Sequence, residues 1–290
     1  MFKNAAELLS ICETYDMKIS EAMLKREVQI SGKSIQQITT NMNRAYNIML
    51  NSIKKSLEED LVSMGGLIGG EAKKIYNRKD ESACGELISR AVSYAMGVLE
   101  VNTSMGLIVA APTAGASGVI PAVFVALQEE RNFTNKDMVR ALFNAGAVGY
   151  IVTRNATVSG AEGGCQAEVG TASAMAASAV VELLGGSPKQ SLDAASTAIS
   201  NTLGLVCDPI AGLVEAPCQK RNAMGASNAL ISAEITLCGI INHIPFDETV
   251  EAMYKVGRSM PFELRETALG GLAATPTGCN LCKSIFKKGK

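Results

Sequence analysis

Apolar side chains recur every three or four positions through the first 60 residues, and charged or polar side chains fill the positions between them. This spacing is clearest in the run Ile35, Ile38, Met42, Ala45, Ile48, Met49 and Ile53. Such a period places the apolar residues on one face of a helix. We therefore expect two or three amphipathic helices in this part of the chain.

A glycine-rich segment, Met64-Gly-Gly-Leu-Ile-Gly-Gly70, ends this pattern, and a polar stretch from Glu71 to Ser82 follows it. Glycine is common where a chain turns, so a structural boundary is expected near residues 60–70. From Ala83 onward, helical stretches rich in small residues alternate with loops of Gly, Pro, Ser and Thr. The spacing predicts helices over 87–101, 121–130, 136–151, 167–184, 191–203, 223–238 and 247–257.

The composition favours helices over sheets. Of the 290 residues, 47% are hydrophobic but only 4% are aromatic, tryptophan is absent, and Ala, Leu, Met, Ile, Gly and Ser dominate. We predict a mainly α fold with one helical domain over residues 1–290. Within it we distinguish an amphipathic N-terminal part, 1–65, a loop-rich part, 83–279, and a basic tail, 280–290.

Charge and cysteine content narrow the class of protein. A formal net charge of -1 argues against a surface for nucleic acid or for an anionic membrane. The longest uncharged run, Val101 to Gln128, contains Pro112 and Pro121 and several polar residues, so a buried loop and helix is expected rather than a membrane span. Eight cysteines without a signal peptide predict reduced thiols and a cytoplasmic protein.

Three cysteines lie in segments where glycine and proline turn the chain. These segments are Glu162-Gly-Gly-Cys165-Gln-Ala-Glu168, Val206-Cys207-Asp-Pro-Ile-Ala-Gly212 and Glu215-Ala-Pro-Cys218-Gln-Lys-Arg-Asn222. Their spacing differs from the short Cys-x-x-Cys ladders of zinc ribbons and ferredoxins, and spacing alone leaves their use open. Three thiolates without a fourth ligand nearby suit a cluster with one iron open to substrate. The later pair, Cys279 and Cys282, is redox-active, a ligand donor or simply exposed.

Two further segments carry candidate binding groups. The loop from Ala111 to Ala122 offers backbone N–H groups and hydroxyls before a helix, which suits a carboxylate or phosphate, although a tight turn between helices explains it equally well. Lys220 and Arg221 follow Cys218 and are either carboxylate ligands or a solvated basic pair. The one histidine, His243, precedes a proline and is interpreted as a loop residue.

The motifs together resemble those of the iron–sulfur L-serine dehydratase family, alpha subunit. They are Ala111-Pro-Thr-Ala-Gly-Ala-Ser-Gly118, Glu162-Gly-Gly-Cys-Gln-Ala-Glu-Val-Gly170, Cys207-Asp-Pro-Ile-Ala-Gly212, Pro217-Cys-Gln-Lys-Arg-Asn222 and Glu266-Thr-Ala-Leu-Gly-Gly-Leu-Ala273. The resemblance covers nearly the whole chain. It implies an oxygen-sensitive 4Fe-4S lyase, independent of pyridoxal phosphate, that converts L-serine to pyruvate and ammonia.

The resemblance also implies roles for particular residues. Cys165, Cys207 and Cys218 match the three cluster ligands, and the fourth iron takes the serine hydroxyl. Cys279 lies where single-chain members end in a cysteine that can occupy the open iron, but eleven residues follow it here. Single-chain members carry a separate N-terminal domain that this sequence lacks, so a beta subunit and an alpha–beta heterodimer are implied.

The proton acceptor and the substrate contacts stay open at this stage. Glu162, Glu168, Lys220 or a group of the beta subunit is the candidate general base. The candidate ligands of the serine carboxylate are Thr113, Gly115, Ser117, Lys220 and Arg221. Two alternatives also use three cysteines: an L-cysteine desulfidase of the same architecture and a non-catalytic iron–sulfur sensor. The sensor gives no reason for the loop at Thr113 or for the Lys220-Arg221 pair.

Overall fold

The computed structural model describes residues 1–287. Helices make up most of this part of the chain, and its only extended pairing is a single bridge between Cys207 and Arg265. The helices are α1 (Ala5–Thr14), α2 (Ile19–Ser31), α3 (Ile35–Glu58), α4 (Glu71–Tyr76), η1 (Lys79–Glu81), α5 (Glu86–Thr103), α6 (Val119–Arg131), α7 (Asn135–Asn155), α8 (Gly160–Gly163), η2 (Gln166–Gly170), α9 (Thr171–Leu183), α10 (Pro188–Ser200), η3 (Ile210–Gly212), α11 (Cys218–Leu237), α12 (Phe246–Ser259), η4 (Phe262–Leu264), η5 (Gly271–Ala274) and α13 (Pro276–Lys287). The predicted mainly α fold is confirmed.

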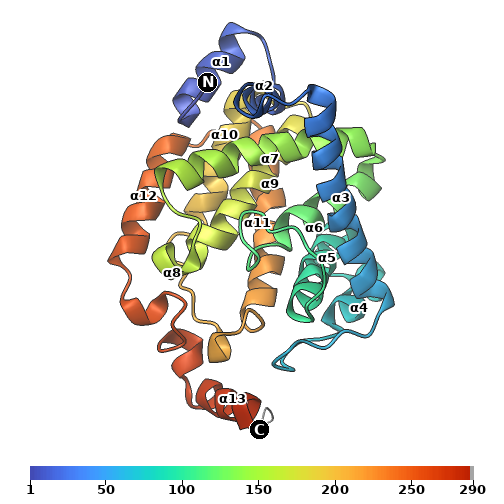
Figure 1. The fold of residues 1–290 in the computed structure, drawn as a ribbon, viewed down its shortest axis with the longest axis vertical. Helices are drawn as coiled ribbons and strands as arrows, with labels where there is room; N and C mark the ends of the chain where they lie inside the picture. The colour runs from blue at the N-terminus through green and yellow to red at the C-terminus, as the bar shows by residue number, and fades with distance from the viewer. Residues whose placement is uncertain (288–290) are drawn as a thin grey trace.

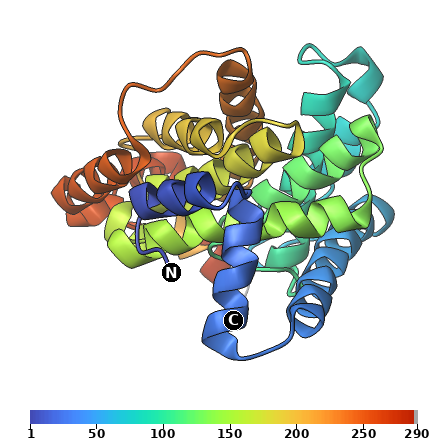
Figure 2. The ribbon, with the colours of Figure 1, turned by 90° about the horizontal axis from the view of Figure 1, so that it is seen from above.

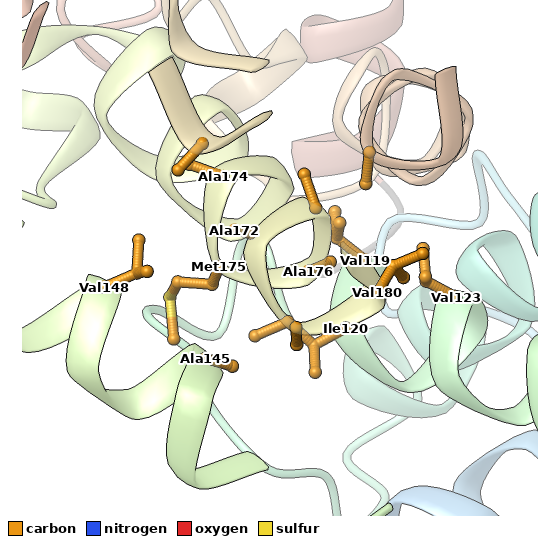
Figure 3. Packing of buried hydrophobic residues seen from close by; sticks show 14 of the residues in the cluster. Val119, Ile120, Val123, Ala145, Val148, Ala172, Ala174, Met175, Ala176 and Val180 are labelled. Carbon is orange, nitrogen blue, oxygen red and sulfur yellow. The ribbon is translucent and has the colours of Figure 1, made fainter. Parts of the chain in front are cut away.

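Helix α9 forms the centre of the molecule, with α6, α7, α10 and α11 packed around it (Figure 1). Its sequence is almost entirely Ala, Ser, Thr and Val, and nearly all of its side chains are buried. Small side chains let neighbouring helices approach closely on every side. Figure 3 shows this core, where Met175 of α9 faces Val148 and Ala145 of α7 and Val180 lies near Val123 of α6.

The N-terminal helices join the same core. Seen from above, α2 crosses α7 (Figure 2), and α3 packs against α5 and α7. Helix α1 is tied to the C-terminal half by Asp247, whose carboxylate accepts hydrogen bonds from the backbone N–H groups of Ala5 (2.8 Å) and Ala6 (3.0 Å). The first turn of a helix has N–H groups without helical partners, so a carboxylate from α12 stabilises this end.

Helix boundaries follow the predictions closely for α5, α6, α7, α10 and α12. Three differences stand out. Helix α11 begins five residues earlier than expected, at Cys218, the predicted helix at 167–184 starts with the π-type turn η2, and helices α4 and α13 were not predicted. Of the predicted basic tail, residues 280–287 belong to α13, and residues 288–290 lie outside the described part of the chain.

The uncharged run 101–128 forms the end of α5, a loop and most of α6. The helix is buried as expected, but the loop is not, since Met105 and Leu107 are exposed. None of the helices described over residues 1–287 combines the length and the apolar character that crossing a bilayer requires. The loops that end α5, α8, α10 and α12 and begin α11 gather at one end of the helical bundle, the lower end in Figure 1. This end holds the candidate chemistry.

Candidate active site

The three glycine- and proline-flanked cysteines come from three separate loops and are all buried. Cys165 immediately precedes the π-type turn η2, Cys207 lies in the extended segment before η3, and Cys218 is the first residue of α11. Backbone and side-chain bonds join the first two loops. The Gln166 N–H donates to the Leu205 carbonyl oxygen (3.0 Å), and the Gly204 N–H donates to Oε1 of Gln166 (2.9 Å).

The thiols interact with one another. A hydrogen bond with Cys165, followed by burial, strongly raises the pKa of the Cys207 thiol. Burial, followed by the charge of Cys165, raises the pKa of Cys218 to about 12. Burial therefore favours the neutral form of the Cys207 and Cys218 thiols. The structure thus brings together all three residues that the sequence singles out as ligands.

Glu168 is the carboxylate beside these thiols. It lies on η2, accepts a hydrogen bond from Thr113 Oγ1 (2.9 Å) and has its Oε2 4.0 Å from Cys207 Sγ. Burial raises its pKa to about 7, against the lowering effect of the Thr113 bond. A π-type turn is uncommon and is found most often at functional sites.

Two glycines leave room around this carboxylate. A Cβ added at Gly160 would lie 2.5 Å from Oε2 of Glu168 and 3.0 Å from Cys207 Sγ, and one at Gly115 would lie 3.2 Å from Oε1 of Glu168. Gly160 therefore has to lack a side chain, and a side chain at Gly115 would press against the Glu168 carboxylate. Glu162, by contrast, is exposed on α8.

Arg221 is held at the site by a buried ion pair. Its Nη1 lies 2.7 Å from Oδ1 of Asp208 and donates to the Val206 carbonyl oxygen at 2.8 Å. Burial lowers the pKa of Arg221, but the neighbouring Cys165 and Asp208 raise it by more than burial lowers it. The pKa therefore lies above its usual value, and the guanidinium stays charged. Asp208 also accepts the Leu272 N–H (2.6 Å), which brings the Glu266–Ala273 motif to the cysteine loops. Lys220 points to the exposed side of α11.

The loop before α6 is fixed by Asn222 of α11. The Asn222 side chain accepts from the Gly118 N–H (3.0 Å) and donates to the Gly115 carbonyl oxygen (2.8 Å). Ser117 is fully buried, and its hydroxyl has no hydrogen-bond partner. A buried hydroxyl without a partner is uncommon in folded proteins. Of the predicted substrate contacts, this places Thr113, Gly115, Ser117 and Arg221 around the cysteine loops and Lys220 outside them.

The other cysteines lie apart from this arrangement. Cys12 is buried in α1, whereas Cys84 lies in a turn before α5 and Cys238 at the end of α11, and both are exposed. Cys279 is exposed on α13, with its thiol 3.8 Å from the Ala273 carbonyl oxygen. Helix α13 packs on η3, next to the Cys207 loop. Within residues 1–287, no three His, Cys, Asp or Glu side chains converge on a position for a single metal ion.

Comparison with known proteins identifies the family. Residues 14–273 match the family model described as serine dehydratase alpha chain. The chain belongs to this family. It is 51% identical over 288 residues to the probable L-serine dehydratase alpha chain of Bacillus subtilis, which covers 99% of this chain and 96% of the relative. It is 44% identical to the L-serine dehydratase alpha chain of Peptoniphilus asaccharolyticus, with both chains covered over their full length.

Membership in the serine dehydratase alpha chain family confirms the resemblance inferred from the motifs and the prediction that the chain is an enzyme, a carbon–oxygen lyase. A third relative differs in length. L-serine dehydratase TdcG of Escherichia coli is 36% identical over 280 residues, which cover 94% of this chain but 61% of that protein. Family members therefore occur both at the length of this chain and as longer polypeptides.

Sequence reasoning missed two residues that organise the site, Asp208 and Asn222. Both stand inside quoted motifs, directly after Cys207 and at the end of Pro217–Asn222, but neither has a chemical role that sequence alone suggests. Their positions beside candidate site residues were the one available signal, because a polar residue that is buried there needs a hydrogen-bond partner. The partner of Asp208 is Arg221, and the partner of Asn222 is the loop before α6.

Proposed function

We propose that this chain is the cluster-bearing subunit of an L-serine ammonia-lyase that converts L-serine to pyruvate and ammonia. The observation that supports this most directly is the gathering of three buried cysteines from three loops around one carboxylate, Glu168, and one guanidinium, Arg221. The names of the relatives supply the reaction.

The cysteines fit a 4Fe-4S cluster. Thiolates are the donors that such clusters require, and Gly160 leaves open the space beside Cys207 Sγ that a Cβ would fill. Because a four-iron cluster is larger than one ion, its ligands surround it without converging on a single-ion position. Cys165, Cys207 and Cys218 would hold it, and Cys279 on the neighbouring helix is a candidate for a resting-state contact. When bound, a cluster with one iron free of protein ligands supplies a Lewis acid for the serine hydroxyl.

Glu168 is the group on this chain that we assign to the proton at Cα of serine. Its Oε1 is oriented by Thr113, which leaves Oε2 for the substrate. Loss of the Cα proton and of hydroxide from Cβ gives 2-aminoacrylate and water. Aminoacrylate then tautomerises to the imine, which water hydrolyses to pyruvate and ammonium. Neither of these later steps needs a protein group.

The substrate carboxylate needs a second anchor, because a single contact at the hydroxyl leaves serine free to rotate. We assign this anchor to the loop from Thr113 to Ser117 together with Arg221. The guanidinium has five N–H donors, so its bonds to Asp208 and Val206 leave others for a carboxylate. Lys220 is exposed, so we assign it to contact with the beta subunit and not to the substrate.

A second polypeptide completes the enzyme in this proposal. The alpha chain naming of the relatives and the greater length of the Escherichia coli protein support a separate beta subunit. The whole of residues 1–290 then acts as one catalytic domain of a cytoplasmic, oxygen-sensitive heterodimer that needs no pyridoxal phosphate.

Anaerobic reconstitution tests this function. The chain, co-expressed with a beta subunit, is treated with iron and sulfide, and cluster absorption and pyruvate release from L-serine are measured. We expect a 4Fe-4S spectrum and turnover that is lost in air. Comparison of L-serine with L-cysteine separates the lyase from a desulfidase. A bound cluster without turnover of either amino acid would favour the sensor, and activity that persists after aeration without iron would contradict an open-site cluster.

Gly115→Ala is expected to lower kcat/KM for L-serine by at least about tenfold while iron content stays unchanged. The added methyl group would stand 3.2 Å from Oε1 of Glu168 and narrow the space between that carboxylate and the substrate loop. Gly146→Ala is the matched control, since its methyl group meets no atom closer than Met23 Cε at 3.9 Å. Equal values of kcat/KM in the two variants would contradict the assignment of this loop to the substrate site.

A further inference from the structure

A buried carboxylate, Glu215, is enclosed by the glycine-rich segment between α3 and α4. Glu215 is 1% exposed. Its two oxygens accept hydrogen bonds from Ser63 Oγ (2.7 Å), the Gly65 N–H (2.6 Å) and the Leu67 N–H (3.1 Å). These bonds cross about half the length of the chain in sequence, and they bring the α3–α4 loop to the end of the molecule where α11 begins (Figure 1). The loop thus binds the side chain of Glu215, which belongs to the segment that carries Cys218.

Glycine is required in this loop for two reasons. A Cβ at Gly65 would lie 2.9 Å from both carboxylate oxygens of Glu215 and 2.6 Å from Leu213 Cδ1, so only a residue without a side chain admits this approach. Gly66 has φ +72°, in the left-handed region that favours glycine. The Ser63 N–H closes the turn by donating to the Ile68 carbonyl oxygen (3.1 Å). The sequence of the loop therefore suits the binding of Glu215.

On the other side of Cys218, helices α4 and α5 hold the side chain of Gln219. Nε2 of Gln219 lies 3.1 Å from Oε1 of the buried Glu100 and 3.4 Å from Oε2 of Glu71, the residue that begins α4. Glu100 in turn accepts the Ala72 N–H (3.0 Å). Cys218 is thus flanked by Glu215, which the loop 63–68 holds, and by Gln219, which Glu100 of α5 and Glu71 of α4 hold.

The attachment at Glu215 is the stronger of the two. A buried carboxylate is costly unless hydrogen bonds replace its water, and three donors do so here. Glu215 is also bonded directly to the first turn of α11, because its carbonyl oxygen accepts the Gln219 N–H (3.0 Å). Holding the Glu215 side chain therefore holds the backbone that carries the Cys218 thiol.

We propose that Glu215 is a positioning residue that, through the loop 63–68, fixes the Cys218 thiol in the buried orientation that cluster binding needs. The proposal rests on the proposed function, because Cys218 needs a fixed orientation only if it binds the cluster. The placement of Cys218 itself can be measured without iron, because a thiol reacts with an alkylating reagent only when it becomes accessible.

The experiment follows alkylation of individual cysteines by iodoacetamide in the full chain after anaerobic removal of iron, with the sites quantified by mass spectrometry. Glu215→Gln places an amide among three hydrogen-bond donors. We expect alkylation of Cys218 to become at least about tenfold faster, with buried Cys12 changed by less than about twofold. Gly65→Ala should produce the same selective effect while Glu215 is retained. Ser63→Ala should produce a smaller one, since Leu67 still donates to Oε2.

Glu234→Gln, exposed near the far end of α11, is the matched control and should leave the alkylation rates of Cys218 and Cys12 unchanged. Cys238 is left out of this comparison, because its thiol lies 3.8 Å from Oε1 of Glu234. In the reconstituted complex, Glu215→Gln should also lose iron to a chelator at least about fivefold faster than the unmodified chain. Equal acceleration at Cys12 and Cys218, or no acceleration at Cys218, would overturn the positioning role. Failure of the unmodified chain to bind a cluster would contradict the proposed function alone, because the alkylation rates would still report on Glu215.

Discussion

Replacement of Cys165, Cys207 or Cys218 by alanine is expected to remove most of the bound iron and to lower L-serine turnover by at least about 100-fold. In the proposed site these three thiolates are the protein's ligands and the fourth iron is left for substrate. Because the cluster already lacks one protein ligand, loss of a second is expected to release it. The measurements are iron and sulfide per chain after anaerobic reconstitution, and pyruvate release from L-serine.

Cys84→Ala and Cys238→Ala are the matched controls, since both thiols are exposed and lie outside the cysteine loops. Their iron content and activity should equal those of the unmodified chain. Cys279→Ala answers a separate question, because its helix packs beside the Cys207 loop: lower iron content in this variant would make Cys279 a ligand in the resting enzyme. Full iron content in Cys207→Ala would contradict the assignment of the three ligands.

Glu168→Gln is expected to lower kcat by at least about 100-fold with iron content retained, as the loss of a general base does. Glutamine has almost the same shape and can still accept the Thr113 hydroxyl through its amide oxygen, so the surrounding loops should keep their places. What it cannot do is take a proton from Cα of serine. Steady-state kinetics at saturating serine, beside iron analysis of the same sample, separate this chemical loss from loss of the cluster.

Glu162→Gln provides the comparison, because this glutamate is exposed on α8 and its removal should change kcat by less than about twofold. A further test is Glu168→Asp, which keeps the carboxylate but shortens its reach and should recover part of the activity. Unchanged kcat in Glu168→Gln would move the proton acceptor either to Lys220 on the exposed side of α11 or to a group of the beta subunit.

The fold class and most helices could be predicted because they depend on local patterns. Small and apolar residues at helical spacing predicted α5, α6 and α7 to within a few residues at each end. Helix α11 shows the limit of that reasoning. Pro217 and the polar run after it indicated a loop. In the structure Ser63 holds the Glu215 side chain and Glu100 holds that of Gln219, and these long-range bonds stabilise a helix that begins at Cys218.

Within the site, the motifs alone singled out the three cysteines, and the family assignment rests on the same segments. The general base could not be chosen in this way, since Glu162 and Glu168 are both carboxylates within three residues of Cys165. Only the π-type turn η2 and the placement of Gly160 and Gly115 turn Glu168 inward, while Glu162 faces solvent. Thr113 likewise donates its hydrogen bond to Glu168, which lies 55 residues further along the chain on η2.

By itself, the sequence determined the helical fold, the family and the residue types available for chemistry, because periodicity and motif identity are local properties. The tertiary structure decided which of those residues meet. Asp208 with Arg221, Asn222 with the loop at Gly115, and Glu215 with the loop at Gly65 are pairs of buried polar groups from distant segments. Burying a polar group without a partner is unfavourable, so these pairings form only when the helices pack and bring both partners out of water together.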